Sequence, residues 1–109
     1  MKRFWDDAAL VQYGEEFGIL LPHTDLAGAY TVAECLRCAI EEAEIESAFG
    51  VIKITASFGV AQTESSDFNI RALLDRADSQ LYEAKRNGRN CVRAHTAAVA
   101  AANLRLATA

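Results

Sequence analysis

The chain has 109 residues, of which 51% are hydrophobic and 24% are charged. This length allows one domain with a modest core and excludes two ordinary domains. The formal net charge of −4 excludes a broad basic surface for duplex DNA or RNA, so a phosphorylated ligand would need a few local cations or a metal ion.

The start of the chain and its cysteines indicate a compartment. No apolar run approaches the ~20 residues that a membrane-spanning helix needs. Asp6 and Asp7 also interrupt the start MKRFWDDAAL before a signal-type apolar region forms. Three cysteines cannot all pair with one another, so we expect reduced thiols. We therefore expect a cytoplasmic protein without membrane insertion.

The first predicted elements are two short strands at 7–12 and 16–21, joined as a β-hairpin. The intervening YGE places Gly14 in the turn, where glycine readily adopts a positive φ. A Thr-Asp pair at 24–25 then offers an N-cap. Apolar residues at spacings of three and four predict a helix that extends to about Ser47.

The second half of the chain continues with a β-branched segment that predicts a strand over 51–61. An apolar stripe from Ile70 to Ala84 predicts another helix, and Gly88 stands where a C′ glycine would end it. A short strand is expected at 90–94. The alanine-rich tail, 95–109, predicts a loose helix or a frayed end.

The order strand, strand, helix, strand, helix, strand predicts an α+β fold. In this fold one sheet is covered by helices on one face.

Four segments of the chain together resemble the GGDEF domain of diguanylate cyclases. YGEEFGILLPHTD resembles the GG(D/E)EF hairpin, its second strand and the next helix cap, and AECLRCAI resembles the helix that follows. ITASFGVA is similar to the T-x-S-x-G-V-A strand, and ALLDRADSQLYEAKRNGRNCV is similar to the ending A-D-x-A-L-Y-x-A-K-x-x-G-R-N-x-V. The order of the segments also matches. We expect a partial GGDEF domain at 7–94 and a separate tail at 95–109.

The resemblance implies a palm-like (ferredoxin-like) fold, related to nucleotidyl cyclases and DNA polymerase palms. It also implies a reaction in which two GTP molecules, one on each of two facing domains, condense to cyclic di-GMP with the help of Mg²⁺. The family's first strand and the helices after it would lie upstream of residue 7 and are missing here. We therefore expect a diguanylate cyclase domain that is truncated and weak or inactive by itself.

The missing strand normally lies in the centre of the family's sheet. Its loss leaves unpaired backbone and apolar surface to be covered, and dimerisation, strand exchange, rearrangement or poor stability are the expected outcomes. The partner would be a second copy of the chain or the missing N-terminal part of the domain. The alternative function is a non-catalytic module that binds GTP, cyclic di-GMP or a protein.

The resemblance assigns roles to five residues by position. Glu15 and Glu16 match the acids of the motif, which makes them metal ligands and catalytic residues. Gly14 matches the second glycine, where the backbone approaches the nucleotide. Lys85 and Arg89 match the cations that hold the β- and γ-phosphates.

Two further features depart from the family pattern. Tyr13 either stands in place of the first glycine or precedes a motif that has lost one glycine. Product inhibition in the family uses R-x-x-D placed five residues before the motif. Asp7 stands at the acidic position, but Phe4 stands where the arginine belongs, and Arg3 is one residue out of register. An inhibitory site would therefore use Arg3 and Asp7. In the T-x-S-x-G segment, the small residues at 57 and 59 suggest close packing rather than catalysis.

Overall fold

The structure is a computed structural model of the 109-residue chain and describes residues 9–13, 16–63, 69–94 and 102–108. Helices and strands alternate irregularly along these residues. In chain order they are β1 (Ala9–Tyr13), β2 (Glu16–Leu21), α1 (Leu26–Glu42), β3 (Ile45–Ser47), β4 (Gly50–Ile52), β5 (Ala56–Gln62), α2 (Ile70–Arg86), β6 (Val92–Ala94) and β7 (Ala102–Thr108).

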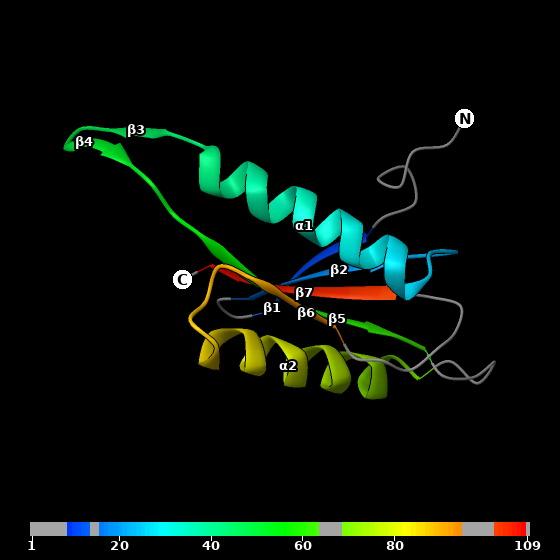
Figure 1. Cartoon of the computed structure of the whole chain (residues 1–109). Helices are drawn as coiled ribbons and strands as arrows, with labels where there is room; N and C mark the ends of the chain where they lie inside the picture. The colour runs from blue at the N-terminus through cyan, green and yellow to red at the C-terminus, as the bar shows by residue number, and fades with distance from the viewer. Residues whose placement is uncertain (1–8, 14–15, 64–68, 95–101, 109) are drawn as a thin grey trace.

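The main sheet has five strands in the order β1-β2-β7-β5-β6. β1 and β2 form the predicted antiparallel hairpin, and β6 runs parallel to β5 at the opposite edge. β7 follows all other described strands in the sequence but lies between β2 and β5, antiparallel to both (Figure 1). It is therefore the link between the two halves of the sheet.

The prediction of a loose helix or a frayed end is wrong for residues 102–108, which form β7. Leu104 and Leu106 alternate with smaller or polar residues, as strand residues do. A central strand also pairs its N–H and C=O groups on both sides, and such pairing outweighs the helix propensity of alanine. Residues 95–101 lie outside the described part of the chain. The boundary of the family domain near residue 94 stays a prediction.

The two helices lie on opposite faces of the sheet, α1 above and α2 below in Figure 1. Phe58 of β5 packs in a cluster with Ala33 of α1, whereas Ala61 packs in a cluster with Leu73 of α2. The predicted α+β class is confirmed, but the expectation that both helices cover one face is wrong. All seven residues of β5 are buried, because helices cover this strand from both sides.

Gly59 brings β5 and α2 into close contact. A Cβ atom at this position would lie 2.1 Å from the carbonyl oxygen of Ala77 and 2.3 Å from the backbone nitrogen of Leu81. Both atoms belong to the backbone of the helix, so only glycine permits this approach. The close packing predicted here is confirmed, and it sets the distance between α2 and the sheet.

Side chains and a glycine turn define the helix ends. Asp25 accepts a hydrogen bond from the backbone of the first turn of α1 at 2.7 Å, which confirms the predicted N-cap. Asn69 caps α2 in the same way. At the other end of α2, the N–H of Arg89 donates to the carbonyl of Ala84 at 3.0 Å, and Gly88 has a φ of 102°. This is a Schellman ending with Gly88 at C′, as predicted.

α1 ends earlier than predicted, and the strand predicted over 51–61 is divided. The helix stops at Glu42, because Ala43 has extended backbone (φ −67°, ψ 137°) and the acidic last turn has no basic residue to offset the helix dipole. The next residues turn back on themselves. Ser47 Oγ donates to the carbonyl of Gly50 at 2.8 Å, and Gly50 has a φ of 115°. This turn joins β3 and β4 in a separate two-stranded ribbon.

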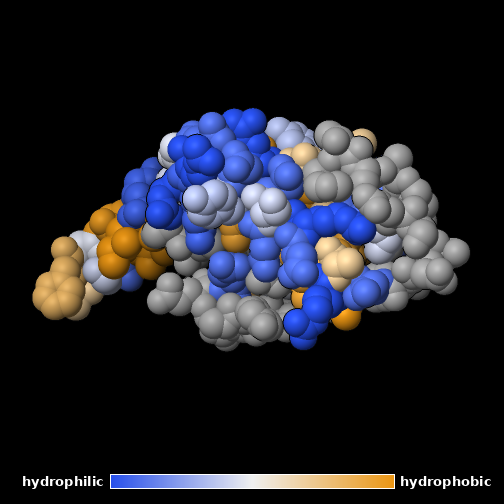
Figure 2. Space-filling model, turned by 90° about the horizontal axis from the view of Figure 1, so that it is seen from below, coloured by the Kyte–Doolittle hydropathy of each residue, from blue (hydrophilic) through white to orange (hydrophobic). Residues whose placement is uncertain are grey.

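The β3–β4 ribbon extends away from the main sheet (Figure 1). Phe49 at its turn is fully exposed, and Val51 is 57% exposed. Figure 2 shows the ribbon as an apolar patch at the left end of the molecule. Among the described residues, neither helix combines the length and apolar character needed to cross a lipid bilayer.

Candidate functional site

The hairpin that carries the predicted acids is partly described. Tyr13 ends β1 and pairs with Glu16, which begins β2 and is half-buried. Gly14 and Glu15 connect these two residues and lie outside the described residues, as do Arg3 and Asp7. Of the predicted motif residues, the structure therefore places Glu16. Tyr13 is a strand residue paired in the ladder, so its backbone is extended.

The sheet register brings Glu16 into line with β5. Glu16 pairs with Ala107 of β7, and Ala107 pairs with Ser57 of β5. Neighbouring strands are ~4.8 Å apart, so the Cα atoms of Glu16 and Ser57 are separated by about 10 Å. Leu20, four residues after Glu16 on β2, packs with Leu73 on the α2 side of the sheet. Because strand residues alternate between faces, Glu16 also lies on the α2 side.

The C-terminal end of α2 reaches the same end of the sheet. The backbone N–H of Asn90 donates to Ser57 Oγ at 3.0 Å, which fixes the turn after α2 against β5. Lys85 lies one helical turn after Leu81 and is half-buried, whereas Arg89 is exposed in the turn. In Figure 1 this end of α2 and the end of β7 both lie on the left. The structure thus brings Glu16, Lys85 and Arg89 to one end of the α2 face.

Arg37 and Asn90 were not selected from the sequence, yet they hold this end together. Arg37 Nη1 on α1 donates to Asn90 Oδ1 at 3.1 Å. Asn90 Nδ2 donates to a carboxylate oxygen of Glu41, also on α1. Asn90 has a φ of 49°, a region that asparagine tolerates better than most residues. The signal in the sequence was the Asn that follows Gly-Arg, a residue type suited to a left-handed turn.

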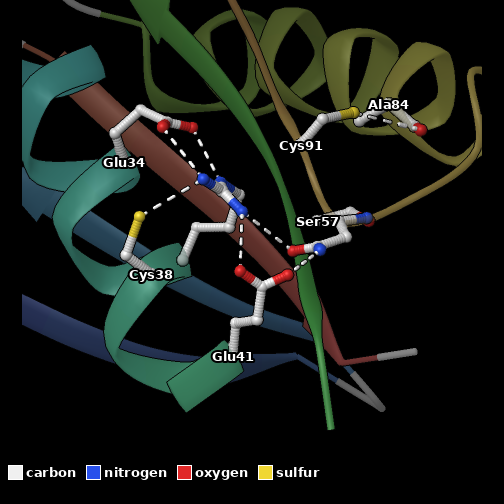
Figure 3. Close-up of polar contacts among 8 residues, drawn as sticks. Glu34, Cys38, Glu41, Ser57, Ala84 and Cys91 are labelled. Carbon is white, nitrogen blue, oxygen red and sulfur yellow. Dashed lines mark hydrogen bonds and ion pairs between the residues drawn. The ribbon is translucent and has the colours of Figure 1, made fainter.

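An ion pair anchors Arg37 itself. Its Nε donates to Glu34 Oε1 at 2.8 Å, and its Nη2 donates to Glu34 Oε2 at 3.2 Å, a bidentate arrangement (Figure 3). This hydrogen bonding lowers the pKa of Glu34 and raises the pKa of Arg37. Arg37 Nη1 also lies 3.7 Å from Glu41 Oε1. α1 therefore holds the guanidinium of Arg37 against Asn90, which is the residue after Arg89.

The described residues do not form a metal site. No group of three or more His, Cys, Asp or Glu side chains within them could hold a metal ion. β7, whose sequence is ANLRLAT, has no carboxylate, and Ala107 stands at the register position beside Glu16. The described ligands thus do not fit Mg²⁺, which takes several hard oxygen ligands. Cys35, Cys38 and Cys91 are free, as expected.

Comparison with known proteins establishes the family of the chain. The profile of the family described as "Diguanylate cyclase, GGDEF domain" matches residues 4–91. The chain belongs to the GGDEF family. The match ends before β7, so the strand in the centre of this GGDEF sheet lies outside the matched residues.

Individual relatives support the same assignment. The chain is 38% identical over 86 residues to "Diguanylate cyclase A" of Treponema denticola, which covers 79% of the chain and 23% of the relative. It is 44% identical over 82 residues to "Diguanylate cyclase VdcA" of Vibrio cholerae (72% and 24%). It is 40% identical over 81 residues to "Response regulator PleD" of Caulobacter vibrioides (72% and 18%). The chain thus spans about a quarter or less of the length of these relatives.

Proposed function

We propose that this chain carries part of a diguanylate cyclase domain and binds the phosphates of GTP or cyclic di-GMP through Lys85 and Arg89. We further propose that it does not convert GTP to cyclic di-GMP by itself. The observation that carries this proposal is the central strand, β7, which fills the middle of the sheet without contributing an acid. A GTP-binding role also requires a compartment that holds GTP, so we propose that the protein is cytoplasmic.

The phosphate-binding part of the proposal is supported by the cations at the end of α2. Lys85 offers a compact charge with three donors, and Arg89 offers a planar fork that suits phosphate oxygens. The Schellman ending and the bond from Asn90 to Ser57 hold the backbone of this turn. Arg89 is exposed, so a ligand can reach it from solvent.

The lack of turnover is supported by the strand beside Glu16, which contains no carboxylate. Joining two GTP molecules requires each 3′-hydroxyl to lose a proton and negative charge to be neutralised at phosphorus, which divalent cations achieve when several carboxylates hold them. Glu15 and Glu16 remain the proposed metal ligands and catalytic residues of the family motif. The strand beside Glu16 adds Ala107 rather than a carboxylate. We therefore propose nucleotide binding without cyclisation in the isolated chain.

The test is titration calorimetry of the whole chain with GTP and with cyclic di-GMP, each with and without Mg²⁺. We expect Lys85→Ala and Arg89→Ala to weaken binding at least about tenfold, because a charge-assisted hydrogen bond contributes about 1.5–3 kcal/mol. Arg86→Ala is the matched control. Arg86 is adjacent to Lys85, but its Nη1 lies 3.8 Å from Glu83 Oε1 and its guanidinium lies over the ring of Tyr82. Because its charge already has these partners, we expect Arg86→Ala to change the affinity less than twofold. Equal losses in all three variants would contradict a specific phosphate site.

The second measurement is product formation. We expect no cyclic di-GMP from GTP and Mg²⁺ in a chromatographic assay. Sustained formation that disappears in Glu15→Ala or Glu16→Gln would show instead that the chain is an active enzyme, and the proposal of binding alone would then fail.

A second candidate function, a protein-interaction module, is favoured by the β3–β4 ribbon. Its exposed apolar side chains extend away from the sheet, which is unusual for a surface without a partner. These side chains are Ile45, Phe49, Val51 and Ile52. Calorimetry separates the two functions. An absence of heat with both GTP and cyclic di-GMP would favour the interaction module.

A further inference from the structure

We propose that Arg37 and Glu41 of α1 are positioning residues for phosphate binding. They hold the side chain of Asn90, and this contact fixes the backbone from which Arg89 extends. The inference rests on the proposed function, in which Arg89 binds the phosphates of GTP or cyclic di-GMP. Neither Arg37 nor Glu41 needs to touch the ligand, because their effect on affinity passes through Asn90, the residue after Arg89.

The first observation is the backbone of the turn after α2. Arg89 and Asn90 both have left-handed backbone, with φ angles of 64° and 49°. Such angles cost free energy in a residue that carries a Cβ atom, so two in succession persist only where the surrounding structure holds them. The conformation that presents Arg89 to a ligand is therefore set by the bonds around it.

Two of these bonds join the backbone of the turn to α2 and β5. The N–H of Arg89 donates to the carbonyl of Ala84 at 3.0 Å. The N–H of Asn90 donates to Ser57 Oγ at 3.0 Å. These bonds hold one side of each peptide unit, but they leave the side chain of Asn90 to be fixed by another element.

α1 is the element that fixes this side chain. Asn90 Oδ1 accepts a hydrogen bond from Arg37 Nη1 at 3.1 Å, and Asn90 Nδ2 donates to Glu41 Oε2. We call these two contacts the Arg37–Asn90–Glu41 bridge. One partner is a donor without acceptors and the other is a carboxylate acceptor, so the amide has a single orientation in the bridge. The bridge therefore ties α1 to the residue that follows Arg89.

The charge of Glu41 has no role in stabilising α1 itself. Glu41 lies in the last turn of the helix, where a negative charge opposes the helix dipole and no basic residue offsets it. Arg37 Nη1 lies 3.7 Å from Glu41 Oε1, but an i,i+4 pair with the basic residue first is the weaker orientation. The hydrogen bond from Asn90, 49 residues later in the chain, is the contact that makes use of this carboxylate.

The bridge acts on only one of the two proposed phosphate-binding cations. Lys85 belongs to α2, and its place depends on the helix rather than on the turn. Loss of the bridge should therefore reduce the contribution of Arg89 to binding and leave that of Lys85. It follows that loss of Arg37 or Glu41 should not weaken binding more than loss of Arg89 does.

The deciding variant is Glu41→Ala, measured by titration calorimetry of the whole chain with GTP. It removes a negative charge from the neighbourhood of the proposed phosphate site, so electrostatics alone would make GTP bind more tightly. A positioning role predicts the opposite sign. We expect binding to weaken by about three- to tenfold, within the range for residues that act through others. Arg37→Ala should cause a similar loss.

Asp25→Ala is the matched control. It also removes a carboxylate from α1, and it weakens the helix because Asp25 is the N-cap. Asp25 lies at the other end of α1, about 24 Å from Glu41 along the helix axis. We therefore expect the affinity for GTP to change less than about twofold. A loss equal to that in Glu41→Ala would reduce the effect to helix stability and overturn the inference.

Two double variants show the route of the effect. When Arg89→Ala is already present, Glu41→Ala should cause no further loss of affinity. When Lys85→Ala is present instead, the loss caused by Glu41→Ala should persist. Equal losses in both backgrounds would mean that the effect does not pass through Arg89. That result, or unchanged or tighter binding in Glu41→Ala alone, would overturn the inference.

A measurement without ligand separates this inference from the proposed function. Amide hydrogen exchange at Arg89 and Asn90, followed by NMR, should become at least about tenfold faster in Glu41→Ala relative to the slowest amides of β5. In Asp25→Ala this ratio should not change. If the native chain does not bind GTP, the proposed function fails, and the exchange rates alone decide whether the bridge positions the turn. If the native chain and Glu41→Ala bind GTP equally well, the proposed function stands and the positioning role fails.

Discussion

Replacement of Gly59 by alanine tests the packing that sets the position of α2. The added Cβ would lie 2.1 Å from the Ala77 carbonyl oxygen, which is 1.3 Å less than the 3.4 Å at which ordinary contact begins. It would also lie 2.9 Å from the Cα atom of Leu81. None of these atoms can rotate away, because they are helix backbone. The helix must therefore move by more than 1 Å or the strand must bend.

Overpacking of a well-packed core typically costs about 1–3 kcal/mol, and occasionally more when backbone must shift. We therefore expect Gly59→Ala to lower the free energy of unfolding by at least about 3 kcal/mol. This loss is a large part of the roughly 5–15 kcal/mol that is the free energy of unfolding of a typical domain. Urea unfolding followed by far-ultraviolet circular dichroism measures it. The slope of the transition shows whether unfolding remains two-state.

Gly28→Ala is the matched control. Its Cβ would meet Thr24 Cγ2 at 3.0 Å and Asp25 Oδ1 at 3.1 Å, both of which are side-chain atoms that can shift. Alanine in a helix also gains about 0.5–1 kcal/mol over glycine. We expect a change within about 1 kcal/mol. If Gly59→Ala were as stable as the native chain within about 0.5 kcal/mol, the reasoning that this glycine fixes α2 would be refuted.

Three further predictions concern polar side chains of α1 and of the turn after α2. Asn90→Ala should lower the free energy of unfolding in urea by about 2–4 kcal/mol, because it removes two side-chain hydrogen bonds and leaves alanine at a positive φ. Asn90→Gly removes the same hydrogen bonds but tolerates the positive φ, so it should recover about 1 kcal/mol of this loss. Because Arg37 lowers the pKa of Glu34, their pair contributes stability at neutral pH that is lost as pH falls below about 4; Glu34→Gln should flatten this acid dependence, by less than about 1 kcal/mol since Glu34 is partly exposed. Asp25→Ala should lower the free energy of unfolding by the ~1 kcal/mol that an N-cap contributes, which is measured as a lower thermal midpoint. Asp25→Ser should restore most of this loss.

Local signals in the sequence determined most of the individual elements. The hairpin followed from two apolar runs about a glycine, β2 was predicted with its observed bounds, and Asp25 and Gly88 were identified as helix ends. Each of these features depends on residues that lie close together in the chain, so the sequence carries the information locally. The family resemblance came from the same kind of short segment, and the match over residues 4–91 confirms it.

Tertiary structure decided which of these local preferences prevailed. The tail has alanines that favour a helix, but residues 102–108 form the central strand because β2 and β5 both need a partner there. The helices cover opposite faces because β5 has apolar residues on both of its faces, Phe58 and Val60 in the cluster with α1 and Ala61 in the cluster with α2. Asn90 acquires its role only when α1 brings Arg37 and Glu41 to it, across 53 and 49 residues of sequence. Pairing and burial between distant segments have no local signature, and at this site they determine which acids and cations can meet.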